Sequence, residues 1–365
     1  MKIKKIDRLD GIDLARFIAF CGMVIVNFKM VMATPEHSSS WIGMIVDSFE
    51  GRAAATFVVL AGISFSLLIK HIGWEHGKLV ILKRILFLLA VGLLHSLIFQ
   101  ADIIRYYALY FLFGLVFFRA STRILIISAL FIPILFVLLL WFFDYDKGWD
   151  WVTLTYIDFW TFKGFSRNLF FNSWHPVIPW LAFFLFGMTL SRQRLHQFST
   201  QLLITITGFF TALMPSLILV VLSNVSIRGL DEFAILFATK PLPPMPLYII
   251  SGIGTASVII GISLLAASWL NKIGKNQLLS LFTCPGRQAL TLYLAHVILG
   301  MTILELLGML GSPQPLPHAL IAALIFCCFA VLFATIWSRY FSYGPVEMLM
   351  RRLTSLQSGL GPGKG

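Results

Sequence analysis

Residues 12–33 read Ile12-Asp-Leu-Ala-Arg-Phe-Ile-Ala-Phe-Cys-Gly-Met-Val-Ile-Val-Asn-Phe-Lys-Met-Val-Met-Ala33, a run long and apolar enough to cross a bilayer as a helix. Further apolar runs follow along the whole chain. With the first run, the predicted spans lie near residues 12–33, 53–70, 79–99, 103–118, 124–143, 175–190, 201–222, 246–269, 288–310 and 318–338. The sequence therefore predicts an all-α, polytopic integral membrane protein of about ten transmembrane helices, with a single domain over residues 1–365.

Composition supports a membrane protein and excludes several other classes. Apolar residues make up 58% of the 365 positions and charged residues only 12%, whereas a soluble domain has about 25% charged residues. The net charge of +12 is spread over short loops, so we expect the lipid bilayer as a partner and no nucleic acid. The four cysteines show no zinc-ligand spacing, so no metal site is predicted. The pattern leaves a homodimer open.

The basic loops predict the orientation of the chain. Met1–Asp10 resembles the start of a signal peptide, but the apolar run after it is too long for one, so we expect a retained first span. Cytoplasmic loops carry an excess of Lys and Arg. If both termini lie in the cytoplasm, loops rich in Lys and Arg alternate along the chain with loops that contain few of them. Residues 34–51 and 144–174 then lie outside. The tail at about 357–365 is predicted to be flexible.

Polar residues gather where the first span ends. Asn27, His37 and Asp47 follow one another at intervals of ten residues. An imidazole takes a proton near neutral pH, a carboxylate orients the imidazole, and an amide N–H stabilises an oxyanion. These are the parts of an acyl-transfer site, although a hydrated loop with a helix-capping Asn explains the same residues.

Other titratable residues fall at the predicted outer ends of several spans and suggest a substrate vestibule. They are Glu50, Arg52, His95, Asp102 and His175. His95 lies inside an apolar run with Asp102 close behind it. An interhelical hydrogen bond is the other explanation for such a histidine.

A smaller group of titratable residues lies within or next to the predicted spans, mostly toward their cytoplasmic ends. Asp13 and Arg16 are spaced to pair on one helix face, or Arg16 binds an anionic ligand instead. Arg287, before the ninth span, is a second candidate for the same anion. Glu305 is a lone carboxylate within that span, and His296 lies in it as well.

Several stretches together resemble the catalytic domain of heparan-alpha-glucosaminide N-acetyltransferase, and within that superfamily its YeiB-like bacterial branch. The first is Arg8-Leu-Asp-Gly-Ile-Asp13-Leu-Ala-Arg16-Phe, followed by Asn27, His37 and Asp47. The others are Gly51-Arg52-Ala-Ala-Ala-Thr-Phe-Val-Val-Leu-Ala-Gly62, His95 with Asp102-Ile-Ile-Arg-Tyr-Tyr-Ala-Leu109, Trp174-His-Pro-Val-Ile-Pro-Trp180, Gly286-Arg287-Gln-Ala-Leu-Thr-Leu-Tyr293 and Phe341-Ser-Tyr-Gly344-Pro-Val-Glu347. The likeness covers nearly the whole chain.

The resemblance implies a transmembrane acyltransferase of a bacterial cytoplasmic (inner) membrane. Acetyl-CoA or another acyl-CoA would enter from the cytosol, with Arg16 and Arg287 as its expected partners. His37 would be the general base, and Asn27 would hold the acyl carbonyl. Asp47 would orient or polarise the His37 imidazole. The spacing from Asn27 to His37 is one residue shorter than the family leads us to expect, so the glucosamine acceptor is not carried over. The acceptor is then a hydroxyl or amine on the extracytoplasmic side, with a saccharide among the candidates.

A secondary transporter that exports a small metabolite is the alternative, with Asp13, Arg16 and Glu305 as its coupling charges. Discontinuous helices and inverted repeats would favour it, and the sequence shows neither clearly. A purely structural or assembly role is a third option.

Overall fold

Helices dominate the computed structural model, which describes residues 9–34, 41–223, 236–310 and 312–355. Within these ranges the sheet is a two-stranded antiparallel hairpin of β1 (Trp149–Asp150) and β2 (Thr155–Tyr156). The helices are α1 (Asp10–Val31), α2 (Trp41–Phe49), α3 (Arg52–Ile72), α4 (Trp74–His95), α5 (Ile104–Phe117), α6 (Thr122–Leu140), α7 (Phe162–Arg167), η1 (Asn168–Asn172), α8 (Val177–Leu190), α9 (Phe198–Ser223), α10 (Pro246–Lys272), α11 (Asn276–Arg287), α12 (Ala289–Ala295), η3 (His296–Met301), α13 (Thr302–Leu306), α14 (Leu316–Trp337) and α15 (Pro345–Thr354). The predicted all-α fold is confirmed.

Seven helical segments of the described chain are long and apolar enough to cross a membrane. They are Asp10–Val31, Trp41–Ile72, Thr122–Leu140, Phe198–Leu222, Pro246–Lys272, Ala289–Leu306 and Leu316–Trp337. Phe162–Asn172 and Val177–Leu190, bent by 50°, make an eighth if they form one span. The apolar helix α5 is shorter, and α4 carries several charged side chains in its first half. A polytopic membrane protein is thus confirmed, whereas the count of ten spans stays a prediction.

Helix α3 lies at the centre of the bundle. It packs against α1, α8 and α10, and its residues Val58, Val59 and Ile63 are fully buried. The long helices α9 and α10 pack against each other along their length. Their approach is close because a Cβ on Gly254 would lie 2.2 Å from the backbone nitrogen of Ala212. Small residues on α10 therefore serve helix packing, as is common in membrane bundles.

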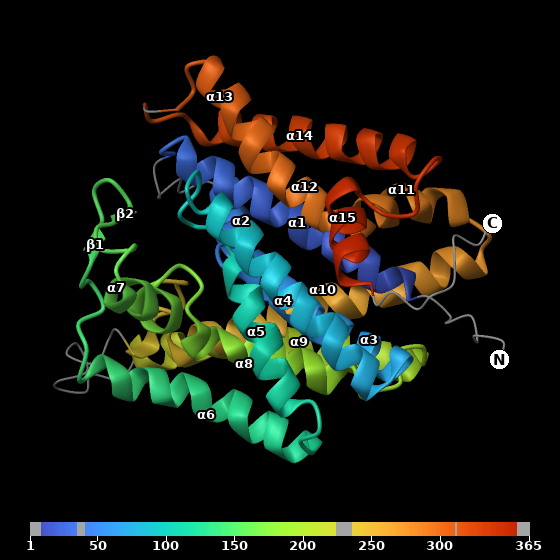
Figure 1. Ribbon diagram of the computed structural model, residues 1–365, viewed down its shortest axis with the longest axis horizontal. Coiled ribbons are helices and arrows are strands. Elements are labelled where there is room, and N and C mark those ends of the chain that lie inside the picture. The colour runs from blue at the N-terminus through green and yellow to red at the C-terminus, as the bar shows by residue number, and fades with distance from the viewer. Residues whose placement is uncertain (1–8, 35–40, 224–235, 311, 356–365) are drawn as a thin grey trace.

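The two ends of the bundle differ in character. Figure 1 shows the β1–β2 hairpin and α7 at one end, and α11 near the opposite end, where α1 begins. In the hairpin region Trp149, Tyr156 and Phe159 form a buried cluster, while Trp160 remains exposed. Residues 144–174 therefore fold into a small cap with its own core. The predicted flexible tail at 357–365 lies outside the described residues.

Candidate functional site

Two cavities lie near the two ends of α1. The arginine cavity, of about 260 Å³, is lined by Arg16, Arg84 and Arg287 together with apolar side chains. The Asn27 cavity, of about 470 Å³, is lined by residues that include Asn27 and His175. Arg16 and Asn27 lie on the same helix, roughly 16 Å apart along its axis. The distribution of basic loops predicts that the arginine cavity faces the cytoplasm and the Asn27 cavity faces outside.

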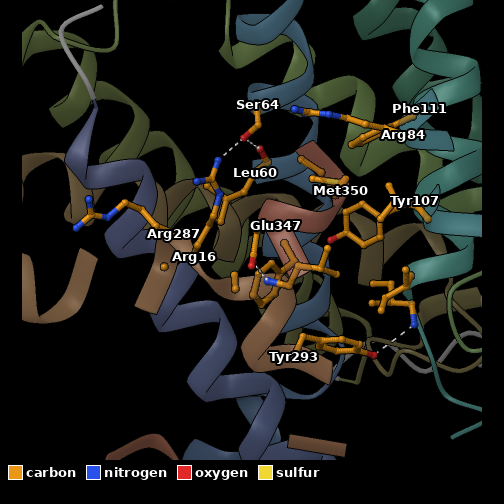
Figure 2. Close-up of a pocket in the computed structure, with 18 residues that line it drawn as sticks. Arg16, Leu60, Ser64, Arg84, Tyr107, Phe111, Arg287, Tyr293, Glu347 and Met350 are labelled. Atoms are coloured by element: carbon orange, nitrogen blue, oxygen red, sulfur yellow. Dashed lines mark hydrogen bonds between the residues drawn. The ribbon is translucent and has the colours of Figure 1, made fainter. Parts of the chain in front are cut away.

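Arg16 is held in place by two neighbours at the wall of the arginine cavity. Its Nη1 donates to Asp13 Oδ1 at 2.5 Å, and its Nη2 donates to Ser64 Oγ at 2.5 Å. Figure 2 shows Arg16 reaching Ser64 from one side and Arg84 pointing toward the cavity from the other. The buried Nε of Arg84 has no hydrogen-bond partner. The sequence did not single out Arg84 as a site residue, so its place in this wall was missed.

Arg287 reaches the same cavity because α11 ends directly against α1. A Cβ on Gly286 would lie 1.8 Å from the carbonyl oxygen of Asp13, so the contact requires a glycine. Arg287 Nη2 donates to Cys284 Sγ at 2.7 Å, and its buried Nε has no partner. In Figure 2 the Arg287 side chain extends away from Ser64. The structure thus brings both predicted CoA-binding arginines to one cavity, with their guanidinium groups pointing in different directions.

Glu347 closes the arginine cavity from α15. It accepts hydrogen bonds from the backbone N–H groups of Leu290, at 2.7 Å, and Thr291, at 3.1 Å, in the first turn of α12. The Thr291 hydroxyl also donates to it, at 2.5 Å. Free N–H groups at a helix start favour an anion, and Glu347 fills that role from another helix. Burial raises the pKa of Glu347, and these hydrogen bonds oppose the rise.

Asn27 is bonded to a histidine that lies far away in the sequence. Its Nδ2 donates to His296 Nε2 at 2.9 Å, and His296 Nδ1 donates to the carbonyl oxygen of Tyr293. The carbonyl contact fixes the imidazole tautomer, because Nδ1 must carry the proton and Nε2 must accept. His296 is fully buried in the π-helical stretch η3, a type of distortion often found at functional sites. From the sequence alone, His296 was a residue of the ninth predicted span with no assigned role.

Lys29 organises the carboxylates beside the Asn27 cavity. Its Nζ donates to Asp47 Oδ1 at 2.7 Å and to Glu50 Oε1 at 2.6 Å, while only 6% of Lys29 is exposed. Lys29 and Glu50 line the cavity. Asp47 therefore has Lys29 as its partner. His37 lies outside the described residues, so its orientation by Asp47 stays a prediction.

Of the other predicted vestibule residues, His175 lines the Asn27 cavity, whereas Arg52, His95 and Asp102 do not. His175 lines the Asn27 cavity, and its carbonyl oxygen accepts from Tyr110 Oη at 2.8 Å. Arg52 is directed at α10, where its Nε donates to Ser251 Oγ at 2.9 Å. His95 and Asp102 form a buried pair, Nδ1 to Oδ1 at 2.7 Å, which does not line this cavity.

The contacting rings of Tyr293, His296 and His95 form an aromatic layer that adjoins both cavities. Tyr293 lines the arginine cavity, and its ring centroid lies 4.9 Å from that of His296, which bonds to Asn27 of the other cavity. The His95 ring lies 5.7 Å from Tyr293 on the same layer. His95 Nε2 is buried without a partner. Residues Tyr293, His296 and Asn27 thus link the cavities through contacting side chains.

Of the features that would favour a transporter, the helix breaks are present, but the proposed coupling charges are not arranged as expected. Helix breaks do occur, between α11 and α12 and between α7–η1 and α8. Glu305, however, is exposed on α13 and lines neither cavity, and Asp13 forms an ion pair with Arg16. Within the described residues, no group of three or more His, Cys, Asp or Glu side chains is placed to hold a metal ion.

The chain matches two protein-family profiles. Residues 8–227 match the profile described as heparan-alpha-glucosaminide N-acetyltransferase, catalytic, and residues 234–357 match one described as a protein of unknown function, DUF418. The chain is also 36% identical over 101 residues to the uncharacterized protein YeiB of Escherichia coli strain K12. That alignment covers 27% of this chain and 26% of YeiB, so the chain spans about a quarter of that relative. No solved structure matches.

Proposed function

The chain belongs to the heparan-alpha-glucosaminide N-acetyltransferase catalytic family, and from that premise we propose that it transfers an acyl group from cytosolic acyl-CoA to an extracytoplasmic acceptor. The membrane in question would be the bacterial inner membrane. The observation that carries the proposal is the Tyr293–His296–Asn27 link between the two cavities. Such a link is what an enzyme needs when donor and acceptor approach from opposite sides.

The arginine cavity suits the donor side. CoA carries phosphate groups, and guanidinium groups bind phosphate through charge-assisted, forked hydrogen bonds. Arg84 and Arg287 each have a buried nitrogen without a partner, so the protein itself does not fully satisfy either guanidinium group. Arg16 is already bonded to Asp13 and Ser64, and it adds positive charge at the same wall.

The Asn27 cavity suits the transfer step. An acceptor hydroxyl or amine would attack the thioester carbonyl carbon, forming the new acyl bond and breaking the carbon–sulfur bond. The acceptor proton would pass to a base, and the departing CoA thiolate would take up a proton. One N–H of the Asn27 amide goes to His296, so the second N–H is left to stabilise the oxyanion. His37 is the proposed base, with His175 of the same cavity and buried His95 as its competitors.

Binding and turnover can be tested separately in purified protein. We expect acetyl-CoA to raise the melting temperature, because a ligand that binds only the folded state stabilises it. Arg84→Ala should weaken this binding, while Lys78→Ala, at an exposed position on the same helix, is the matched control. Turnover is measured as the free CoA that is released when the acetyl group passes to hydroxylamine, used as a small acceptor. Asn27→Ala should lower it about 10²–10³-fold while acetyl-CoA still binds.

Two results would contradict the proposal. One is the absence of any stabilisation at millimolar acetyl-CoA. The other is binding that is indifferent to Arg84→Ala together with turnover that is indifferent to Asn27→Ala. The second pattern would place the chemistry elsewhere and would favour the transporter.

A further inference from the structure

Arg105, near the start of α5, is a buried cation without a carboxylate partner. It is 2% exposed, and the ion pairs found among the described residues do not include it. The nearest acid in sequence, Asp102, uses Oδ1 for His95 and accepts the backbone N–H of Arg105 through Oδ2, at 3.2 Å. Buried charges are normally paired because desolvation is costly. An unpaired buried guanidinium therefore points to a missing anion.

The guanidinium makes its hydrogen bonds through one nitrogen. Nη2 of Arg105 donates to Tyr106 Oη at 2.7 Å, to the Gln100 carbonyl oxygen at 3.2 Å and to Asn168 Oδ1 at 3.4 Å. Nε and Nη1 have no hydrogen-bond partner. The rings of Tyr106 and Phe159 lie 4.6 Å and 5.2 Å from the guanidinium carbon and supply only part of the missing compensation.

A third cavity, the hairpin cavity, lies against this guanidinium. It has about 120 Å³, and its lining includes the polar residues Arg105, Gln100 and Asn168 and the apolar residues Leu97, Phe159 and Trp160. It contains no carboxylate in its wall. Leu97 and Trp160, which are 64% and 68% exposed, mark its open side. The cavity sits under the β1–β2 hairpin, at the end of the bundle that is predicted to lie outside.

The amides in this wall present donors. Gln100 Oε1 accepts the backbone N–H of Tyr156 at 3.1 Å, which fixes the amide so that its NH2 group is the unused end. Asn168 Oδ1 accepts from Arg105 and from Tyr106 Oη, the latter at 3.1 Å, and this again leaves the NH2 group. Neither NH2 group has a hydrogen-bond partner among the described residues. Arg105 and two amide side chains with unused NH2 groups therefore line one small space.

We propose that the hairpin cavity binds a compact oxyanion, a carboxylate or a phosphate group. Guanidinium and amide donors match both groups, and the guanidinium charge would then be neutralised. The volume equals that of roughly four liquid waters, which admits such a group but no nucleotide. Aromatic walls suit the apolar atoms that carry the anion. The site rests on its own geometry and does not depend on acyl transfer.

The test compares anions and charge variants in purified protein. Melting temperature is measured in neutral detergent against acetate and inorganic phosphate, with chloride at matched ionic strength as the reference. In Asn168→Asp, a nearly isosteric carboxylate is placed beside Arg105. We expect it to raise the melting temperature without any anion and to abolish the saturable rise that acetate or phosphate gives the wild type. Gln100→Glu, at a partly exposed position, is a second variant in case the first does not fold. Thr153→Asp, on the exposed hairpin, adds the same charge away from Arg105. Its melting temperature should still rise with acetate or phosphate.

A second measurement separates the sources of the anion. Native mass spectrometry compares retention of phosphatidylglycerol with that of phosphatidylcholine. Preferential retention of phosphatidylglycerol that Asn168→Asp removes would assign the site to a lipid phosphate, and a response to acetate or phosphate without it would assign a soluble anion. A wild type that responds to neither anions nor phosphatidylglycerol overturns the proposal. So does a response of Asn168→Asp or Gln100→Glu that equals the response of Thr153→Asp.

Discussion

Glu347 offers a prediction whose size follows directly from its contacts. Glu347→Ala leaves the N–H groups of Leu290 and Thr291 without their acceptor at a half-buried to buried helix start. Each such loss costs about 1–3 kcal/mol, so a total of about 3 kcal/mol is reasonable. With an unfolding entropy of about 2 cal/mol/K per residue, that free energy corresponds to a melting temperature lower by roughly 4 °C.

Glu347→Gln separates hydrogen bonding from charge. The amide oxygen still accepts the two backbone N–H groups, and the Thr291 hydroxyl turns to accept from the new NH2 group. Burial raises the pKa of Glu347 above its ordinary 4.5 in the folded protein. A raised folded pKa means that the stabilising contribution of protonation is complete below 4.5 and is lost as the pH rises through the raised value. Wild type should therefore lose stability over that window, and Glu347→Gln should lose less.

Thermal melting of the purified protein from pH 4 upward checks both statements. A melting temperature of Glu347→Ala equal to that of the wild type would contradict the expected loss of stability. Equal instability of Glu347→Gln and Glu347→Ala would also contradict it, because the acceptor oxygen that Gln shares with Glu would then have no role.

Two further predictions concern topology and the base. Cysteines introduced at Ser39 and Lys163 should react with an impermeant reagent in intact cells; protection of either would reverse the assigned orientation. His37→Ala should lower turnover about 10²–10⁴-fold with acetyl-CoA binding retained, measured as CoA release beside His95→Ala and His175→Ala. Loss of turnover in one of the latter two, with His37→Ala near wild type, would move the base to that residue.

Sequence patterns predicted the fold because hydrocarbon-length apolar runs impose helices directly. The number of spans was harder to predict, since α4 is long enough but charged and α5 is apolar but short. Charge position alone pointed to Arg16 and Arg287, which do share a cavity. It could not show that Arg84 joins them, because a basic residue at a span end has the same signature as a topology charge.

The pairings around Asn27 were not predictable from local spacing. Asn27 and His296 are 269 positions apart, and only helix packing brings them together. The interval from Asn27 to Asp47 suggested cooperation with His37, whereas the lysine two residues after Asn27 binds Asp47. Lys29 itself could have indicated this ion pair, because a lone amine near the end of an apolar span needs a carboxylate nearby.

The aromatic layer next to the two cavities also has an electrical consequence. The rings of Tyr293 and His296 are in contact, so we expect this path to be closed to water and ions. Moving one elementary charge through a potential of 100 mV takes about 2.3 kcal/mol. An acyl group is neutral, and its passage across the layer would take no electrical work. A seal at this position would let the protein hand over a chemical group while the cell keeps its membrane potential.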